Sequence, residues 1–483
     1  MNRKFTINLI FLLTVNLLIK PYWIFGVDRV IQNKFTVGEY GTYFAAFNYS
    51  FLLSIILDFG INNFNNRAIS RDKKRLGEYL VNLMMVKGVL SVIYFALTFV
   101  SALMTGFDEL QMKMLFFLAV NQILLSAILY FRSNIAALQF FKTDSIISTL
   151  DRLLAIIFCL CLLYMPMFKD KFTIMWFIYA QTGALLVTAL IAFAVIAGKS
   201  TIQFNIWKGK FTRMILLKSA PFAMLALLMG VYYRIDAVMI AQMLPNGDDE
   251  AGIYAASFRL LDAVNQFGYL FATLLLPMFA GMIRKNESLR QLVKLSSELL
   301  FVIAVITAAD CYFFRNEMMT LLYKNATPYW GQIFGWLMFT FVPMSSIYVF
   351  GTILTAKGTL KVLNYIALGG MVLNITLNLY LIPHYGALGA TFATLITQFL
   401  AAWAHIIVTN KTFGFVYEVK EVIQLSAFVV LSCLALYGIK MLPIDWRLSL
   451  VAASAACVVI AAGTGLLPIS EFIGLIVPSK ATS

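Results

Sequence analysis

Charge is scarce in this sequence, since only 12% of its 483 residues are Asp, Glu, Lys or Arg. Soluble globular domains carry about 25% charged residues, so this scarcity excludes a water-soluble protein. Histidine is scarcer still, because His384 and His405 are the only two and lie too far apart in sequence to suggest a metal site. The five cysteines all lie in apolar stretches, where cysteine is usually a small buried hydrophobe, and they predict neither disulfides nor zinc ligands.

Catalytic motifs are missing as well. The chain contains no G-x-S-x-G nucleophile elbow and no H-E-x-x-H zinc motif. The stretch GKST at 198–201 resembles the end of a phosphate-binding loop, but Phe193 stands where that loop requires its first glycine. We therefore expect a protein that is not an enzyme and that has no metal and no cofactor, with coupling to H⁺ or Na⁺ left open.

Apolar residues make up 61% of the chain, and its mean hydropathy is +0.84. A transmembrane helix needs about 20 apolar residues, so the chain can hold about 14 spans and little else. The first apolar run is long and lacks a small-x-small cleavage site, and we take it as an uncleaved span. The sequence thus predicts an all-α polytopic membrane protein with spans near 5–25, 40–63, 79–105, 113–138, 146–166, 173–197, 216–244, 252–282, 296–314, 331–356, 362–382, 387–409, 422–440 and 447–467.

Most Lys and Arg residues lie in the short links between apolar runs, so the net charge of +14 indicates membrane topology rather than a nucleic-acid partner. With the N-terminus in the cytoplasm, the inward links and tails hold 22 of the 37 Lys and Arg residues, and the outward links hold nine. The positive-inside rule then favours a cytoplasmic N-terminus and a cytoplasmic C-terminus. An even number of spans follows from this topology.

Two stretches of the chain look alike. GTYFAAF at 41–47 and GIYAASF at 252–258 both fit G-x-Y-x-A-x-F, at an offset of 211 residues. Pro166 with Gln181 and Pro383 with Gln398 share a spacing of 15 residues, at an offset of 217. Chance can produce such matches in a sequence rich in these residues, but a duplication explains both. Because the copies lie six spans apart, we expect two parallel six-helix lobes, 1–200 and 201–412, followed by two extra helices in 413–483.

Three stretches carry a family resemblance: VGEYGTYFAAFNYSFLLSIILDFGINNFNNRAISRD at 37–72, RIDAVMIAQMLPNGDDEAGIYAASFRLLD at 234–262 and NITLNLYLIPHYGALGATFATLITQ at 374–398. They resemble the polysaccharide-transporter branch of the multidrug/oligosaccharidyl-lipid/polysaccharide (MOP) exporter superfamily, and the nearest members look like bacterial O-antigen flippases. The resemblance implies two six-helix lobes with two extra helices, working by alternating access. It implies that an isoprenoid-pyrophosphate-linked oligosaccharide crosses the bacterial inner membrane, and it leaves other polysaccharide-assembly membrane proteins open as partners.

Eleven charged residues fall inside the predicted spans and at least four residues from a span end, where each charge costs about 2.5–3.5 kcal/mol and is a functional candidate by default. Arg offers phosphate oxygens a planar fork and Lys a point charge. We expect pyrophosphate contacts from Lys87, Arg132 and Arg152 toward the cytoplasm and from Lys20, Arg234 and Arg259 toward the outside. The carboxylates expected to couple transport or to stabilise the fold are Asp58, Asp236, Asp262 and Asp310, with Asp151 next to Arg152.

Some of these charges have a plainer explanation. Arg152 and Lys20 lie near span ends and can extend to the membrane surface without touching substrate. Counting outward from the turn near residue 248 places Asp236 level with Arg259. Residues two apart on a helix point about 200° away from each other, so we expect Asp236 to pair with Arg259 and Arg234 to face a cavity between the lobes.

Two other functions stay open beside the flippase. A cation-coupled multidrug antiporter of the same superfamily would use Asp58, Asp236 and Asp310 as H⁺ or Na⁺ sites. A membrane-embedded glycan polymerase or ligase would need a large outer loop, and the longest outward link here runs only from about 315 to 330. The duplicated halves and the basic residues at two depths favour the flippase.

Overall fold

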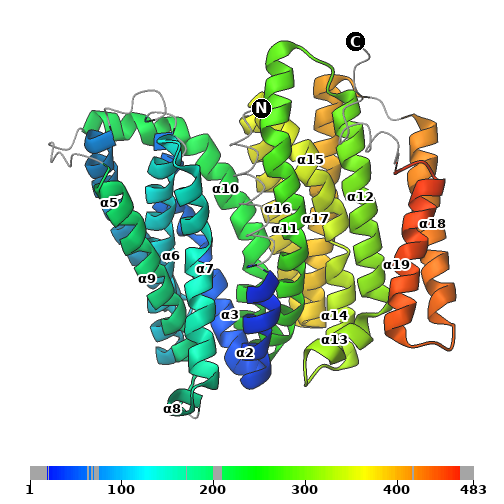
Figure 1. Cartoon of the computed structure of the whole chain (residues 1–483). Coiled ribbons are helices and arrows are strands. Elements are labelled where there is room, and N and C mark those ends of the chain that lie inside the picture. Colours follow the sequence, from blue (N-terminus) through cyan, green and yellow to red (C-terminus); the bar gives the residue numbers. More distant parts are fainter. Residues whose placement is uncertain are drawn as a thin grey trace. The chain divides into compact units, whose positions relative to one another are not determined.

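The computed structural model describes residues 19, 21–62, 65–66, 69, 76–169, 171–199, 209–415 and 418–467, and it contains helices and no β-strand in these ranges (Figure 1). Twelve helices of this part are long and apolar enough to cross a membrane. They coincide with the twelve predicted spans from 79–105 onward, so the prediction of an all-α polytopic membrane protein is confirmed. The predicted span 5–25 lies largely outside the described residues, and the total of 14 spans stays a prediction.

The chain divides into two compact units that do not follow the order of the sequence. The first comprises the residues up to Ala256 together with Ile375–Ala387, and the second comprises Ser257–Asn374 and the residues from Leu388 onward. The first unit contains η1 (Trp23–Asp28), α2 (Arg29–Lys34), α3 (Val37–Leu52), η2 (Ser54–Leu57), α5 (Leu76–Met104), α6 (Glu109–Ala137), α7 (Phe141–Tyr164), α8 (Pro166–Lys169), α9 (Ile174–Ala197) and α10 (Gly209–Met243). The second contains α12 (Arg290–Phe313), α13 (Arg315–Leu322), α14 (Pro328–Met338), α15 (Phe341–Lys357), α18 (Val419–Lys440) and α19 (Trp446–Gly463), while α11 (Gly247–Lys285), α16 (Leu360–Tyr385) and α17 (Ala387–Phe413) contribute to both units.

Helix α3 begins where the sequence supplies a capping box. The Thr36 side chain accepts a hydrogen bond from the backbone N–H of Glu39, and the Glu39 carboxylate accepts one from the backbone N–H of Thr36. These bonds satisfy two donors that the first turn of a helix leaves without partners. The helix runs for 16 residues and ends at Leu52. The predicted span 40–63 is therefore not one continuous helix, because a 3₁₀ turn and a left-handed turn follow.

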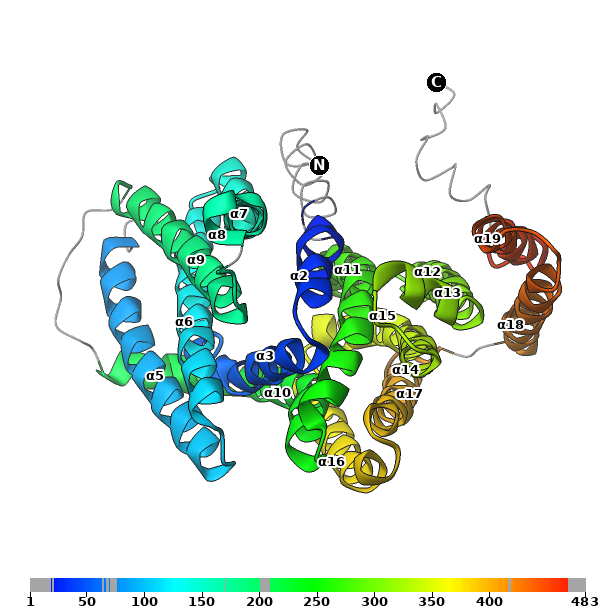
Figure 2. The same cartoon turned by 90° about the horizontal axis from the view of Figure 1, so that it is seen from below.

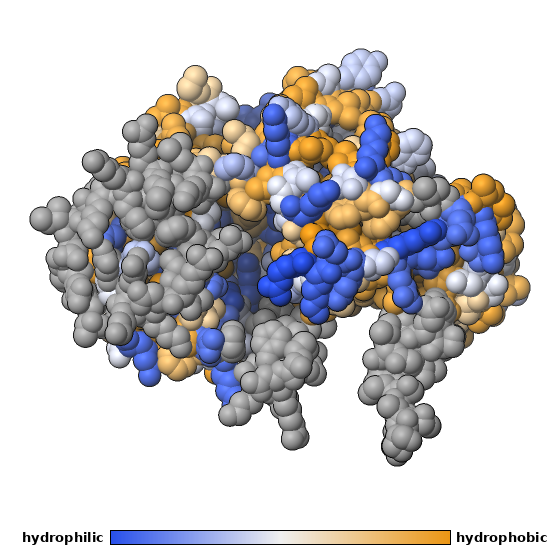
Figure 3. Space-filling view, turned by 90° about the horizontal axis from the view of Figure 1, so that it is seen from above, coloured by the Kyte–Doolittle hydropathy of each residue, from blue (hydrophilic) through white to orange (hydrophobic). Residues whose placement is uncertain are grey.

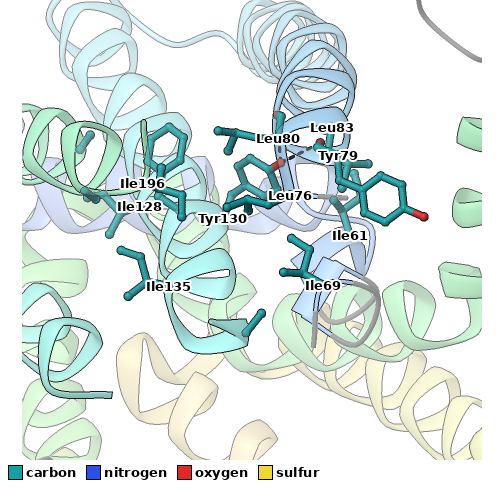
Figure 4. Packing of buried hydrophobic residues seen from close by; sticks show 14 of the residues in the cluster. Ile61, Ile69, Leu76, Tyr79, Leu80, Leu83, Ile128, Tyr130, Ile135 and Ile196 are labelled. Carbon is teal, nitrogen blue, oxygen red and sulfur yellow. Dashed lines mark hydrogen bonds between the residues drawn. The ribbon is translucent and has the colours of Figure 1, made fainter. Parts of the chain in front are cut away.

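A hydrophobic core fills the space between α5, α6 and α9 in the first unit (Figure 4). Leu80 and Leu83 from α5 lie beside Ile128 from α6 and Ile196 from α9. Tyr130 is buried among them, and its hydroxyl donates to the carbonyl oxygens of Tyr79 and Leu80 at 3.1 and 3.0 Å. A buried phenol needs such partners, so this core fixes α5 against α6 by packing and by hydrogen bonds.

In the second unit, α18 and α19 lie side by side and both pack against α12 (Figures 1 and 2). Phe428 from α18 is fully buried against Val302 and Val305 from α12. Ion pairs join α12 to the start of α18, from Arg290 to Glu418 at 3.2 Å and from Lys294 to Glu421 at 2.6 Å. At the other end of α18, Lys440 lies 3.5 Å from Glu317 on α13. Exposed pairs contribute little to stability, so apolar packing holds these helices and the charges fix their register.

Hydrophilic side chains gather on the face seen in Figure 3, where α11 ends and α12 begins in the second unit. Lys285 lies 3.5 Å from Glu287 in this turn, and both side chains are exposed. Gly358, with φ +84°, ends α15 and allows the chain to turn into α16. Lys357 and Lys361, predicted for the inward link between α15 and α16, lie on the last turn of one helix and the first turn of the next. The inward orientation of this link stays a prediction.

Two glycines of the repeated motif bring α3 and the start of α11 into backbone contact within the first unit. A Cβ on Gly41 would overlap the carbonyl oxygen of Asp248, and a Cβ on Gly252 would overlap that of Val37. Val37 and Asp248 are separated by the same 211 residues as Gly41 and Gly252, so the contact is reciprocal. We call these four residues the glycine contact; only glycine permits the two backbones to approach so closely.

The glycine contact predicts that alanine is not tolerated there. Gly41→Ala and Gly252→Ala each place a methyl group on a backbone carbonyl that cannot rotate away, and we expect a loss of about 1–3 kcal/mol, measured as a lower melting temperature of the purified protein. Gly230→Ala in α10 is the matched control, because a Cβ there meets no atom within 4 Å. Equal melting temperatures for Gly41→Ala and Gly230→Ala would contradict the contact.

Candidate functional site

Asp28 is a fully buried carboxylate that the sequence prediction missed. It ends the π-helical turn η1 and is 1% exposed. The Tyr40 hydroxyl lies 2.9 Å from both carboxylate oxygens, and Gln32 donates to one of them at 3.1 Å. The first span was predicted to stop at residue 25, whereas the helix continues to Lys34. The four-residue spacing of Asp28 and Gln32 was the signal that the helix continues.

Asp236 on α10 is a second buried carboxylate with a tyrosine partner. It is 1% exposed, and it accepts hydrogen bonds from the Tyr254 hydroxyl at 2.9 Å and from the Asn378 amide at 2.7 Å. Three helices, α10, α11 and α16, thus meet at one carboxylate within the first unit. The expected pairing of Asp236 with Arg259 stays a prediction, and the sequence reasoning missed both Tyr254 and Asn378.

The two carboxylate and tyrosine pairs occupy related positions in the repeat. At the offset of 211 residues, Tyr254 corresponds to Tyr43 and Asp236 corresponds to residue 25. Asp28 comes three residues after that position and Tyr40 three residues before Tyr43. Asp28 and Tyr40 therefore both lie about one helical turn nearer to the link between their two helices than Asp236 and Tyr254 do. Tyr43 itself hydrogen-bonds to the amide of Gln181, with a nitrogen to oxygen distance of 3.2 Å.

Arg234 lies against the last turns of α3. Its guanidinium donates to the Asn48 side-chain oxygen at 3.3 Å and lies 5.2 Å from the ring centres of Phe51 and Tyr233. An amide oxygen and two aromatic faces can orient a guanidinium. Placement of Arg234 toward a cavity between the lobes stays a prediction.

Each cation expected toward the cytoplasm has a carboxylate neighbour. Lys87 lies 3.2 Å from Asp58, and both come from the expected set. Arg132 makes a two-pronged contact with Asp144, at 2.8 and 3.4 Å. The sequence prediction missed Asp144 because it began the fifth span at residue 146, whereas α7 begins at Phe141.

Arg152 on α7 has a partly exposed side chain. Its nearest carboxylate oxygen belongs to Asp151, at 3.7 Å, and its guanidinium lies 5.4 Å from the ring centre of Trp23. The side chain is 40% exposed, which suits the explanation that it extends toward the membrane surface. Lys20, expected in the outer group, lies outside the described residues.

The remaining expected residues belong to the second unit. Asp310 on α12 accepts a hydrogen bond from Ser454 on α19 at 2.7 Å, and it is 8% exposed. This bond ties the last helix to α12, which is a structural use of the carboxylate. Arg259 and Asp262 are both partly buried on α11.

A cavity of about 460 Å³ opens beside the glycine contact in the first unit. Glu39, Asp248 and Asp249 supply its charge, and Thr42 and Gln111 add neutral polar groups. Three carboxylates without a lining cation repel a pyrophosphate. This cavity is therefore no candidate for the anionic headgroup. Within the described ranges, no group of three or more His, Cys, Asp or Glu side chains is arranged to hold a metal ion.

The geometry at Asp28 predicts a coupled effect on stability. Tyr40→Phe removes one donor from both oxygens of a buried carboxylate, and we expect a loss of about 1–3 kcal/mol, measured as a lower melting temperature. Adding Asp28→Asn should cost less in the Tyr40→Phe background than in the native protein, because the donor is already gone. Tyr164→Phe, at an exposed helix end, should have almost no effect. Strictly additive losses would show that the two groups do not interact.

Comparison with known proteins identifies the family. A family model described as polysaccharide biosynthesis protein matches residues 6–283. The lipid III flippase of Escherichia coli (strain K12) is 26% identical over 226 residues, which are 45% of this chain and 54% of that protein, and the lipid III flippase of Shigella flexneri matches equally. The chain thus spans about half the length of the curated relatives it matches.

Solved structures show the same fold over nearly the whole chain. The lipid II flippase MurJ in an inward closed conformation superposes with a TM-score of 0.68 at 14% identity, over 98% of this chain and 99% of that one. An inward-facing multidrug resistance MATE transporter of the MOP superfamily superposes with a TM-score of 0.61 at 15% identity, over 83% and 94%. The chain therefore shares the fold of these two transporters, and it belongs to the polysaccharide biosynthesis protein family.

Proposed function

We propose that this protein is a flippase that carries an isoprenoid-pyrophosphate-linked oligosaccharide across the bacterial inner membrane by alternating access. The match of the polysaccharide biosynthesis family over residues 6–283 carries the proposal, together with relatives named lipid III flippase. The O-antigen repeat unit is the finer proposal for the glycan. The proposal includes two six-helix lobes, 1–200 and 201–412, with two extra helices in 413–483.

A lipid-linked pyrophosphate is an amphiphile whose charged part must cross an apolar layer. A cation inside the layer lowers that barrier, because opposite charges attract more strongly where the dielectric constant is low. Arg234 supports such a role, since Asn48 and two aromatic rings hold its planar guanidinium in a fixed orientation. A fixed guanidinium can donate two parallel hydrogen bonds to phosphate oxygens. We assign the outer contact with the headgroup to Arg234, and we keep Arg259 as a second member of the outer group.

Toward the cytoplasm, we assign binding of the pyrophosphate headgroup to Arg132 and Arg152. Their carboxylate partners each carry one negative charge, whereas a pyrophosphate diester carries two. The headgroup can therefore compete with Asp144 for the Arg132 guanidinium, and the exposed Arg152 can receive it first. Asp58, Asp236 and Asp262 are proposed as carboxylates that couple transport to H⁺ or Na⁺ or that stabilise the fold.

The test uses the purified protein in proteoliposomes that contain a fluorescent isoprenoid-pyrophosphate oligosaccharide. Flipping is measured as the fraction of label that a membrane-impermeant quencher cannot reach. We expect Arg234→Ala to slow flipping about tenfold or more, because a charge-assisted hydrogen bond contributes roughly 1.5–3 kcal/mol. Arg234→Lys should retain part of the rate, since it keeps the charge and loses the fork.

Arg447→Ala is the matched control, because Arg447 is exposed and lies over the ring of Trp446 at the start of α19. It should flip at the native rate. Normal flipping by correctly folded Arg234→Ala would remove Arg234 from the site. Failure of the intact native protein to flip any lipid-linked pyrophosphate, with cation-driven efflux of a dye, would replace the flippase by the multidrug antiporter that shares this fold.

A further inference from the structure

The predicted span 40–63 is broken partway along its length. Helix α3 ends at Leu52, a 3₁₀ turn covers Ser54–Leu57, and Phe59 and Gly60 have positive φ values of 46° and 77°. From the start of α3 to the break is about 24 Å at 1.5 Å per residue, which lies within a hydrocarbon layer of about 30 Å. Non-helical backbone at this depth must be satisfied by the protein itself.

The Leu57 carbonyl at this break receives two side chains from other helices. The ammonium group of Lys87 on α5 donates to it at 2.8 Å, and the hydroxyl of Ser126 on α6 donates at 3.0 Å. The same ammonium group lies 3.2 Å from an Asp58 oxygen, which also accepts a hydrogen bond from the backbone N–H of Asn62 at 3.3 Å. Lys87 thereby holds two consecutive residues within the break, and Asp58 also contacts the helical residue that follows it.

The ammonium group is positioned entirely by the protein. An ammonium has three N–H donors: two of them meet Leu57 and Asp58, and the group lies 5.8 Å from the ring centre of Tyr130. The Lys87 side chain is only 9% exposed. The hydroxyl of Tyr130 is in turn held by the carbonyls of α5, so the ring cannot move away. A charge enclosed in this way is better placed to stabilise the fold than to bind the headgroup during transport.

The Lys87 ammonium contacts a carbonyl oxygen and a carboxylate, and the Ser126 hydroxyl is hydrogen-bonded to the same carbonyl. Membrane transporters use this set, at the ends of broken helices, to hold a free Na⁺. Hard cations prefer such oxygen ligands. We propose that the Lys87 ammonium is a tethered substitute for a monovalent cation, and that Leu57, Asp58 and Ser126 form a Na⁺ site that the chain itself fills. This inference is independent of the proposed function.

The experiment removes the tether and supplies the ion. Lys87→Ala deletes the charge and leaves room beside the three oxygen ligands. The purified variant is melted in chloride salts of Na⁺ and of N-methyl-D-glucamine at equal ionic strength, with the native protein in parallel. We expect Na⁺ to raise the melting temperature of Lys87→Ala by at least about 3 °C more than it raises that of the native protein, and to do so saturably.

Two controls separate a refilled site from a general salt effect. Lys87→Met removes the charge but fills the space with a side chain of similar length, and it should show no extra response to Na⁺. The double variant Lys87→Ala with Asp58→Asn keeps the space but loses the anionic ligand, and it should also show none. An equal Na⁺ response in all variants, or a Lys87→Ala protein that is unfolded in both salts, would overturn the proposal.

Discussion

The cost of an unsatisfied polar group in an apolar medium is the constraint on which this structure depends. An isolated charge or a bare carbonyl inside a membrane costs several kcal/mol, so every such group must find a partner within the chain. Asp28 and Asp236 are held by tyrosine hydroxyls, and the carbonyl at the break after α3 is held by Lys87. These contacts join nearby helical segments, and the hydrogen bond from Asn378 to Asp236 joins two helices whose partners are 142 residues apart in sequence. The polar groups that the membrane penalises thus also help to assemble the first unit.

The repeated motif has a structural use that its sequence pattern did not reveal. Gly41 and Gly252 bring two backbones together through a reciprocal contact at one offset, and the tyrosines that follow them hold polar partners in both copies. The two copies differ in the helix that follows the motif. The first copy is broken after Leu52, whereas the corresponding part of α11 continues without interruption to Lys285. The predicted duplication would explain the common geometry, and the residues around Asp58 give the first copy a charged break.

Hydropathy predicted the fold class and twelve of the spans within a few residues, because a membrane helix is specified by length and apolar content alone. It failed at span ends, where both missed carboxylates lie: Asp28 is beyond the expected end of the first span, and Asp144 is before the expected start of the fifth. Counting depth along ideal helices also cannot detect a π-helical turn or the break at Leu53–Gly60. The partners of Asp236 were missed because neutral tyrosine and asparagine side chains carry no charge signal in a sequence.

A flippase of the proposed kind must recognise an anionic headgroup on a lipid. Native mass spectrometry of the purified protein tests this most directly, with equal amounts of an isoprenoid-pyrophosphate oligosaccharide and of the corresponding free isoprenoid alcohol. The account predicts that one molecule of the pyrophosphate lipid stays bound per chain, that inorganic pyrophosphate displaces it, and that the alcohol is lost. Equal retention of both lipids, or retention of neither, would contradict it.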